Sequence, residues 1–540
     1  MMGSREKEEQ RRLLAGVDDA DLSLEFSSEP DSSRSIADAC QISDGASHHP
    51  AWSGSLISSI RHRFSKARRP HVRRRYSLYW FCNIVVCLLA IIGVLLAVCG
   101  AFFPSYTKPA ARYDVLRRRA RETRDQPGRV NPHNESVFIA ASLYDPKGAL
   151  VSGYWGRAVQ DLVNLLGPDN VHVSIYEDNA SEQSKSALAS LGEALSCDST
   201  LVAEALNTTE LPQLLLPGGT HKLSRIAFLA EVRNRALRSL NDLESSVPSK
   251  RFDKLLYLND VAFDPVDAAK LLLSTNADES TGHTDYLAAC AVDFINPFKF
   301  YDTFATRDAE GYGMGVPFFP WFTGAGDAMS RRDVLAQKDA VRVKSCWGGM
   351  VAFEARWFYQ STTLASKSGS AAKMQRPLRF RAGNEAFWES SECCLIHADL
   401  DALATTETGP TRHGIFMNPY IRVAYSPAVL RWLPFTRRFE RLYSPVHTLV
   451  NAIAKRPGHN PRRLHQPDTM VTDRVWTWRD SADQEPKDGL DGAFQDVSRA
   501  SLPGGFCGMR KASWINEHPS KGQSRWTSMR APEDNGLIAA

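Results

Sequence analysis

The residues best suited to chemistry follow a short apolar run in the middle of the chain. Residues 255–258 are aliphatic and aromatic enough to form a buried strand, which ends at the polar pair Asn259 and Asp260. Pro265 then stands where the next helix would begin. Ligands of open α/β sheets bind beyond the carboxyl ends of the strands, and magnesium and manganese prefer oxygen ligands. Asp260 therefore either binds a divalent cation that carries a phosphorylated ligand or only caps a turn.

A second acidic turn follows an earlier strand. Residues 171–176 alternate between apolar and polar types and end at Glu177 and Asp178. The two acidic turns would open on the same edge of a parallel sheet, with one carboxylate for ribose hydroxyls and one for a metal on a diphosphate. The chain has neither a Walker-type loop nor a Rossmann glycine fingerprint, so nothing supports a kinase or a dinucleotide enzyme.

The elements that must position these turns alternate along the chain. Strand-like runs followed by helical patterns indicate an α/β domain with a mostly parallel sheet. The expected strands are 136–142, 171–176, 255–258 and 286–292, and the expected helices are 153–166, 183–195, 223–240 and 266–273. The formal net charge of +4 is small, so nothing global predicts a nucleic-acid partner.

One stretch near the N-terminus is long enough to cross a bilayer as a helix. Residues 79–103 are almost wholly apolar, with Asn83 the only strongly polar side chain, and aromatic residues flank both ends. The basic cluster at 61–75 favours a cytosolic N-terminus, although the other flank is basic too. Glycosylation sequons give weak support to a lumenal C-terminal part. They follow the span, at Asn134, Asn179 and Asn207.

The chain is therefore expected to be a single-pass membrane protein. Its expected parts are a disordered basic cytosolic tail (1–78), a transmembrane helix (79–103), a stem (104–132), the α/β domain (133–431) and a partly disordered C-terminal extension (432–540). Six cysteines follow the span, which permits disulfides in an oxidising lumen, but their pairing stays open.

Seven short motifs occur together in an order that resembles one family. They are FIAAS at 138–142, YEDNAS at 176–181, RN at 233–234, LNDV at 258–261, SCWGGM at 345–350, LRFR at 378–381 and SECCLIHAD at 391–399. Over about 137–423 the chain resembles the fungal capsule-associated α-1,3-mannosyltransferases of glycosyltransferase family 69. The resemblance implies a GT-A type fold, GDP-mannose as donor, a mannose-containing glycan as acceptor and Mn²⁺ or Mg²⁺ as cofactor. It also implies a type II Golgi membrane protein with a lumenal catalytic domain, acting in cell-wall, capsule or glycan synthesis.

The resemblance assigns the donor and metal sites residue by residue. Asn259 and Asp260 stand where GT-A enzymes place an Asp-x-Asp metal motif, but the first acid is Asn, so Asp260 is the expected direct ligand. His397 is the expected late metal-binding histidine, with Asp399 as the competing choice. The expected donor-binding residues are Ser142, Glu177, Asp178, Arg233, Asn234 and Asn259.

The acceptor is expected at a glycine-containing loop. Trp347, Gly348 and Gly349 resemble the Trp-Gly-Gly acceptor loop of some galactosyltransferases, in which the tryptophan could stack on a sugar. The alternative is a tight turn beside a core tryptophan.

The implied reaction keeps the anomeric configuration of the donor. A metal on Asp260 together with Arg233 would neutralise the departing diphosphate, whose oxygen could take the acceptor proton. A double displacement would instead need a carboxylate nucleophile. The candidates for that role are Asp327, Glu354 and Glu385, and the sequence does not choose among them.

The sequence is also compatible with two other functions. One is transfer from another nucleotide sugar, such as UDP-xylose. The other is a non-catalytic lumenal factor for polysaccharide assembly or export, because the first Asp of the metal motif is missing.

Overall fold

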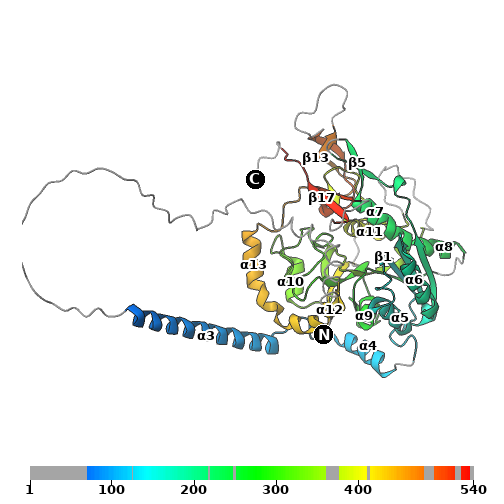
Figure 1. Cartoon of the computed structure of the whole chain (residues 1–540). Helices are drawn as coiled ribbons and strands as arrows, with labels where there is room; N and C mark the ends of the chain where they lie inside the picture. Colours follow the sequence, from blue (N-terminus) through cyan, green and yellow to red (C-terminus); the bar gives the residue numbers. More distant parts are fainter. Residues whose placement is uncertain are drawn as a thin grey trace, which may run out of the picture. The chain divides into compact units, whose positions relative to one another are not determined.

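The computed structural model describes residues 70–123, 126–216, 219–246, 251–360, 376–409, 414–478, 492–516 and 524–534. The tail that we predicted to be disordered lies outside these residues as far as position 69. The chain divides into two compact units, with the boundary between Ala97 and Val98. One described helix, α3 (Pro70–Phe102), is long and apolar enough over Tyr79–Phe102 to cross a membrane, judged by length and composition alone (Figure 1).

A nine-stranded sheet forms the centre of the larger unit. The strand order is β3-β2-β1-β6-β10-β7-β12-β9-β8. The strands are β1 (Val137–Leu143), β2 (Val171–Asp178), β3 (Asp198–Glu204), β6 (Lys254–Leu258), β7 (Ala288–Phe294), β8 (Arg307–Asp308), β9 (Val341–Ser345), β10 (Met350–Glu354) and β12 (Ile415–Ala424). Only β10 and β9 run against the other seven strands. The predicted α/β fold with a mostly parallel sheet is confirmed.

The helices begin where the sequence carries capping residues. The Ser181 side chain accepts a hydrogen bond from the backbone of Ser184 at the start of α6 (Glu182–Ala194). Asp264 caps α9 (Pro265–Ser274), whose first residue is the expected proline. The helix predicted over 223–240 is two helices instead, α7 (Arg225–Ala236) and α8 (Arg238–Ser246).

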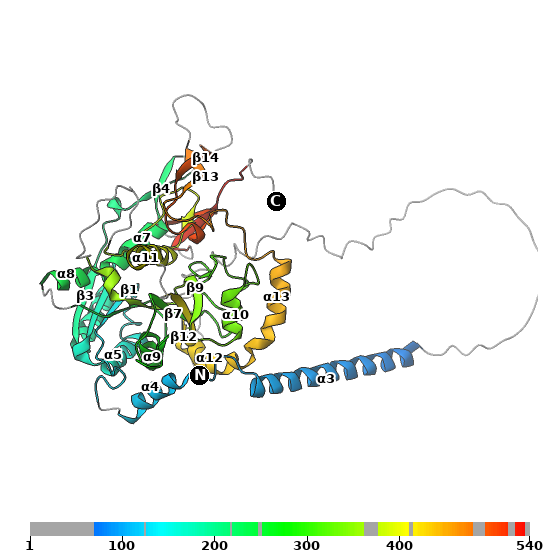
Figure 2. The same ribbon diagram turned by 180° about the vertical axis from the view of Figure 1, so that it is seen from behind.

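Each face of the sheet is covered by its own layer of helices (Figure 2). Because side chains alternate along a strand, Phe138 and Ala140 of β1 face one layer, and Ile139 and Ala141 face the other. The first layer contains α7 and α11 (Glu392–Thr408), and the second contains α5 (Tyr154–Leu166) and α9. The core is therefore continuous on both sides of the strands that carry the acidic turns.

The stretch expected to be a stem is packed against the domain rather than extended. Residues 111–122 form α4 (Ala111–Glu122), whose Tyr113, Leu116 and Ala120 belong to the same apolar cluster as α5 and α9. The Tyr113 hydroxyl donates to Asp339 and accepts from the Asn418 amide. Within the expected stem (104–132), at least residues 111–122 therefore belong to the folded larger unit.

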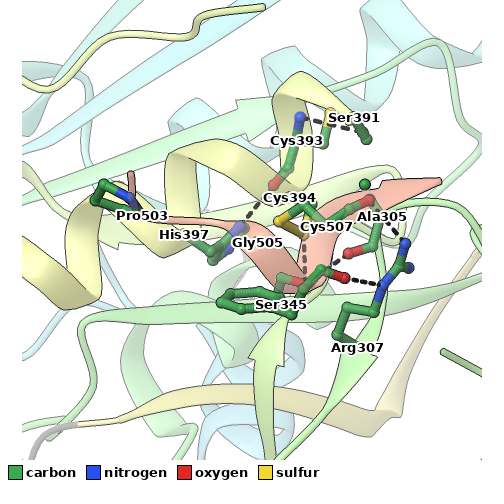
Figure 3. The surroundings of a disulfide bond; sticks show 12 residues. Ala305, Arg307, Ser345, Ser391, Cys393, Cys394, His397, Pro503, Gly505 and Cys507 are labelled. Atoms are coloured by element: carbon green, nitrogen blue, oxygen red, sulfur yellow. Dashed lines mark hydrogen bonds between the residues drawn. A yellow bond between two sulfur atoms is a disulfide. The ribbon is translucent and has the colours of Figure 1, made fainter. Parts of the chain in front are cut away.

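The segment after residue 431, predicted to be a C-terminal extension, lies in the same compact unit as the sheet. Its described elements are α12 (Pro427–Thr436), η4 (Arg437–Leu442), α13 (Tyr443–Ile453), β13 (Met470–Trp478), β14 (Gly492–Ala500), β15 (Gly508–Met509), β16 (Lys511–Ile515) and β17 (Trp526–Arg530). A disulfide joins Cys394 of α11 to Cys507 (Figure 3). The Arg307 side chain also donates to the carbonyl oxygens of Phe506 and Cys507, both at 2.9 Å.

Candidate active site

The carboxyl edge of the parallel strands collects the residues of the candidate site. The register pairs Ala141 of β1 with Leu258 of β6, so Ser142 and Asn259 follow at the same edge. It also pairs Leu143 with Glu177, which brings the first acidic turn there. The antiparallel strand β10 begins at this edge, because Met350 pairs with Leu258. The turn that precedes Met350 therefore lies beside the Asn259–Asp260 turn.

The Asn259 residue is held by three elements. Its backbone N–H donates to the Gly349 carbonyl, and its own carbonyl accepts from the Trp155 indole, both at 2.9 Å. Its side-chain oxygen accepts from the Arg233 guanidinium at 3.1 Å. The turn is thus rigid, and the Asn259 side-chain oxygen is engaged by the protein.

The Asp260 side chain is exposed to solvent at the centre of this edge. Desolvation by the surrounding protein nevertheless raises the pKa of its carboxyl group, with Asp145 adding to the rise and Arg233 opposing it. Asp260 is thus exposed to solvent, although nearby protein atoms disfavour its charged form. An open carboxylate in such a position is suited to bind a cation.

The Arg233 side chain, predicted to steady the diphosphate or the sugar, is buried and bonded within the protein. Its Nε donates to Glu392 at 3.0 Å, and its guanidinium carbon lies 4.4 Å from the centre of the Trp347 ring. Asn234 is also occupied. Its amide exchanges two hydrogen bonds of 2.9 Å with the backbone of Phe380. Both residues therefore position the site and do not face a donor.

The Trp-Gly-Gly sequence forms a tight turn beside a core tryptophan, the alternative that the sequence left open. Trp347 is buried against Tyr257 and Phe380, so its ring faces are not available for stacking on a sugar. Gly348 and Gly349 both have positive φ angles, of 55° and 65°. A Cβ atom on Gly348 would lie only 2.0 Å from the Ala291 carbonyl oxygen, so the turn requires glycine there.

The two late metal-ligand candidates are excluded by their partners. The His397 Nδ1 lies 2.7 Å from the Cys393 carbonyl oxygen, and its Nε2 lies 3.9 Å from the sulfur of Cys290. That sulfur is joined to Cys346 in a disulfide, so it is not a metal ligand. Burial lowers the pKa of His397 to about 4, so the ring is neutral. Asp399 is buried and paired with Arg381 at 2.7 Å. The observed partners of His397 therefore do not favour its predicted role as a metal ligand.

The side chains of the first acidic turn, Glu177 and Asp178, accept hydrogen bonds from within the protein. Glu177 is buried and accepts hydrogen bonds from the Asp145 backbone, at 3.0 Å, and from the Ser184 hydroxyl. Asp178 accepts from the backbone of Leu206 at 2.8 Å. Glu177 therefore does not face a nucleoside, whereas Asp178 and Ser142 remain partly exposed at the edge.

The carboxylates proposed as nucleophiles do not gather around Asp260. Glu385 is paired with two arginines, Arg462 at 2.8 Å and Arg499 at 2.7 Å. Glu354 pairs in register with Lys254, at the opposite end of β6. Asp327 is exposed, and its described hydrogen bond is from its backbone to Glu310. The observed partners of Glu385 and the position of Glu354 do not favour a nucleophilic role, and Asp327 makes no described contact with the site.

An acidic pair that the sequence reasoning missed lies at the same edge. Asp293 is the next-to-last residue of β7. Its Oδ1 accepts from the Asp302 backbone at 3.1 Å, and its Oδ2 accepts from the Tyr425 hydroxyl at 3.2 Å. Asp302 in turn accepts from the Gly348 N–H at 3.3 Å. Burial and the neighbouring Asp302 charge raise the pKa of Asp293 to about 8. The pair thus supports the glycine turn and holds a proton at neutral pH.

This missed pair had a visible sequence signal. Asp293 follows the apolar strand at 286–292 as the Asn259–Asp260 pair follows 255–258. The partner Asp302 could not be identified, because it follows the strand after an irregular loop.

A divalent cation fits the described residues only in part. Asp260 supplies one open carboxylate, which suits an ion held mainly by phosphate oxygens and water, as magnesium commonly is. Among the described residues, the one cluster with metal-ligand types is Cys290, Cys346 and His397, and its two sulfurs are bonded to each other.

Residues 136–399 match the model of a family described as cryptococcal mannosyltransferase 1. No curated protein sequence shows significant similarity to the chain.

Several solved structures are similar to the chain. The mannosyltransferase PcManGT from Pyrobaculum calidifontis, in complex with GDP-Man and Mn²⁺, is 13% identical, with 69% of this chain and 88% of that chain covered and a TM-score of 0.30. Mannosyl-3-phosphoglycerate synthase from Rubrobacter xylanophilus is 13% identical, with 74% and 93% covered and a TM-score of 0.25. TarS 1–349 from S. aureus is 11% identical, with 56% and 65% covered and a TM-score of 0.26.

Proposed function

We propose, on the premise that residues 136–399 belong to this mannosyltransferase family, that the protein transfers mannose from GDP-mannose to a mannose-containing glycan. One observation carries the proposal: the matched residues run from β1 to α11 and include every acidic turn and glycine turn of the site. The open Asp260 carboxylate is the group around which the site is arranged.

Asp260 would hold a divalent cation, Mn²⁺ or Mg²⁺, together with the donor diphosphate. When bound, the cation supplies positive charge that neutralises the departing diphosphate. The chain itself keeps Asp260 in place through Asn259, which Arg233, Gly349 and Trp155 hold from three sides. Ser142 and Asp178 are the exposed polar groups available to the nucleoside at the same edge.

The reaction is proposed to form an α-1,3 linkage with retention of configuration. The proton of the acceptor hydroxyl would pass to the departing phosphate oxygen, so no separate base is needed. This route is supported by the positions of Glu354 and Glu385, which are bound elsewhere. The Asp293–Asp302 pair is assigned a positioning role, because it holds the N–H of Gly348.

The proposed location is the Golgi membrane, with a single span at 79–103, a cytosolic N-terminus and a lumenal domain. Two observations support a lumenal domain. The three sequon asparagines, Asn134, Asn179 and Asn207, are all exposed. Two disulfides, Cys290–Cys346 and Cys394–Cys507, suit an oxidising compartment.

The test uses the full chain in nanodiscs with Mn²⁺, short α-mannosides and a panel of nucleotide sugars. Hexose addition from GDP-mannose alone, seen as a mass increase of the acceptor, is the expected result. Addition from another donor would keep a transferase and discard the donor assignment. If no donor supports turnover and GDP does not bind in the presence of Mn²⁺, the chain is not a transferase.

A further inference from the structure

Two helices near the C-terminal side of the larger unit expose an unusual number of large apolar side chains. Trp432 and Phe435 of α12 are 58% and 55% exposed. Val446, Leu449 and Ile453 of α13 are 59%, 61% and 73% exposed. Their spacing of three and four residues places the three α13 side chains on one face of that helix. We call these five residues the α12–α13 apolar face.

The opposite sides of the same helices are fixed to the domain. Leu433 of α12 is buried, as are His447 and Asn451 of α13. The Asn451 side chain accepts from the backbone of Val316 at 2.8 Å, and the Arg331 guanidinium lies 3.0 Å from the His447 Nδ1. Figures 1 and 2 both show α13 on the outside of the domain, away from the central sheet. The helices are thus anchored by one side and present the apolar face outward.

The segment between the two helices is bonded to the end of the candidate span. The Arg438 guanidinium donates to the Gly100 carbonyl at 3.3 Å, and the Ser105 backbone donates to the Arg437 carbonyl at 3.2 Å. The Phe439 ring packs so closely on Gly100 that a Cβ there would lie 2.7 Å from it. Gly100 is within the last turn of α3. The junction η4 therefore lies where the span would leave the bilayer, and an eleven-residue helix starting there extends about 16 Å.

The charged side chains that accompany the apolar face are mostly basic. The basic side chains over 427–456 are Arg431, Arg437, Arg438, Arg441, Lys455 and Arg456. The one acid in this stretch, Glu440, is buried and paired with Arg422 at 2.9 Å, so it does not oppose them at the surface. Amphipathic helices with a basic polar side and exposed Trp, Phe and Leu bind in the headgroup region of membranes.

We propose that the α12–α13 apolar face lies in the headgroup region of the bilayer that the span crosses, so that the protein is held to the membrane at two places. The inference rests on the proposed membrane span. Contact at two places would restrict the rotation of the catalytic domain about its anchor. Five large apolar side chains exposed on two neighbouring helices are typical of an interaction surface.

The test labels the full chain in nanodiscs that contain phosphatidylcholine, phosphatidylserine and a lipid with a photoactivatable group in its acyl chain near the headgroup. Labelled peptides are identified by mass spectrometry. We expect label on peptides from 79–102 and from 427–453. Matched controls are Leu464, Met470 and Leu502, which are 68%, 72% and 58% exposed and lie outside the two helices. They should carry no label.

The outcomes separate the inference from the proposed span. Label on the span without label on 427–453 would show that the α12–α13 apolar face does not contact the bilayer. It would leave the proposed membrane span unchallenged. No label on either would overturn both. Chemical cross-links between two copies at α13, in place of lipid label, would make a second copy the occupant and would also overturn the docking.

Two double variants test whether the labelling of 427–453 is specific. Leu449→Glu with Ile453→Glu places charges on the outward face without touching the buried side, so folding should be kept. Labelling of 427–453 should fall roughly tenfold, because charged residues disfavour burial in the interface. Leu464→Glu with Met470→Glu should leave that labelling unchanged. Undiminished labelling in the first variant would contradict the proposal.

Discussion

The guanidinium carbon of Arg233 lies 4.4 Å from the centre of the Trp347 ring. This contact joins α7 to the loop before β10, and the same guanidinium binds Asn259 after β6 and Glu392 of α11. One buried cation therefore connects the glycine turn with the turn that carries Asp260. Its function is to keep these two turns in one arrangement.

Removing the Arg233 side chain should lower both stability and activity, each for its own reason. Arg233→Ala leaves the buried Glu392 carboxylate unpaired, which should lower the free energy of unfolding by about 3–5 kcal/mol. The double variant Arg233→Ala with Glu392→Gln should recover much of this loss, because no buried charge then lacks a partner. Activity should stay low in both, because Asn259 loses its side-chain partner. Denaturant unfolding and initial rates of transfer measure the two effects.

Arg235→Ala is the matched control for Arg233. Its side chain is paired with Glu231 and Glu204 near the surface. We expect a stability change of about 0–1 kcal/mol and unchanged activity. Full activity in the double variant would mean that Arg233 is not a positioning residue.

The acidic pair at β7 should make stability depend on pH. The pKa of Asp293 is raised from 3.8 to about 8 by burial and by Asp302, so the folded state binds a proton that the unfolded state has lost. The contribution of Asp293 to the free energy of unfolding therefore falls as pH rises from about 4 to about 8, and it changes little above that range. Thermal unfolding midpoints measured from pH 5 to pH 9 should show this decline.

Asp293→Asn isolates the contribution of this group, because an amide can still accept the Asp302 hydrogen bond but does not titrate. The variant should lose less stability than the unmodified protein between pH 5 and pH 8. Parallel pH profiles for the two proteins would show that Asp293 ionises normally.

The strand ends could be predicted from the sequence, whereas the partners of their side chains could not. Apolar runs and capping residues place β1, β2, β6, β7 and the turn at Asn259, because these depend on local patterns. The partners of Arg233 and Glu385, Glu392 and Arg499, lie 159 and 114 positions away in the sequence. No local pattern reports such a pairing or the burial that accompanies it.

The surroundings of Trp347 and His397 could not be predicted for the same reason. The Trp-Gly-Gly motif is typical of a sugar-binding loop, yet packing against Phe380 buries Trp347. The His397 ring lies near a disulfide whose pairing the sequence left open. Tertiary packing decides both cases.

The proposed topology predicts three N-linked glycans. Asn134, Asn179 and Asn207 are exposed, so each can be modified if the domain is lumenal. Treatment with a peptide N-glycosidase should increase the electrophoretic mobility of the protein. Each Asn→Gln substitution should reduce this mobility shift by the contribution of one glycan. A protein whose mobility does not respond to the glycosidase in a eukaryotic host would contradict the lumenal orientation.

The disulfide between Cys394 and Cys507 should stabilise the C-terminal part of the domain. It closes a chain separation of 113 residues, so replacing both cysteines by serine should lower the free energy of unfolding by about 2–5 kcal/mol. Cys197→Ser is the control, since Cys197 is a free thiol. Equal stability of the double variant and the control would show that this bond is absent from the folded protein.

Asp260 is the residue on which the proposed site depends most directly. The decisive measurement is the initial rate of GDP release from GDP-mannose by the full chain in nanodiscs, with Mn²⁺ and a mannoside acceptor, for Asp260→Ala and for the exposed control Glu193→Ala. We expect a loss of roughly a hundredfold or more in Asp260→Ala, because the cation would lose its protein ligand, and an unchanged rate in Glu193→Ala. An Asp260→Ala protein that keeps the full rate with Mn²⁺ present would contradict the assignment of the site.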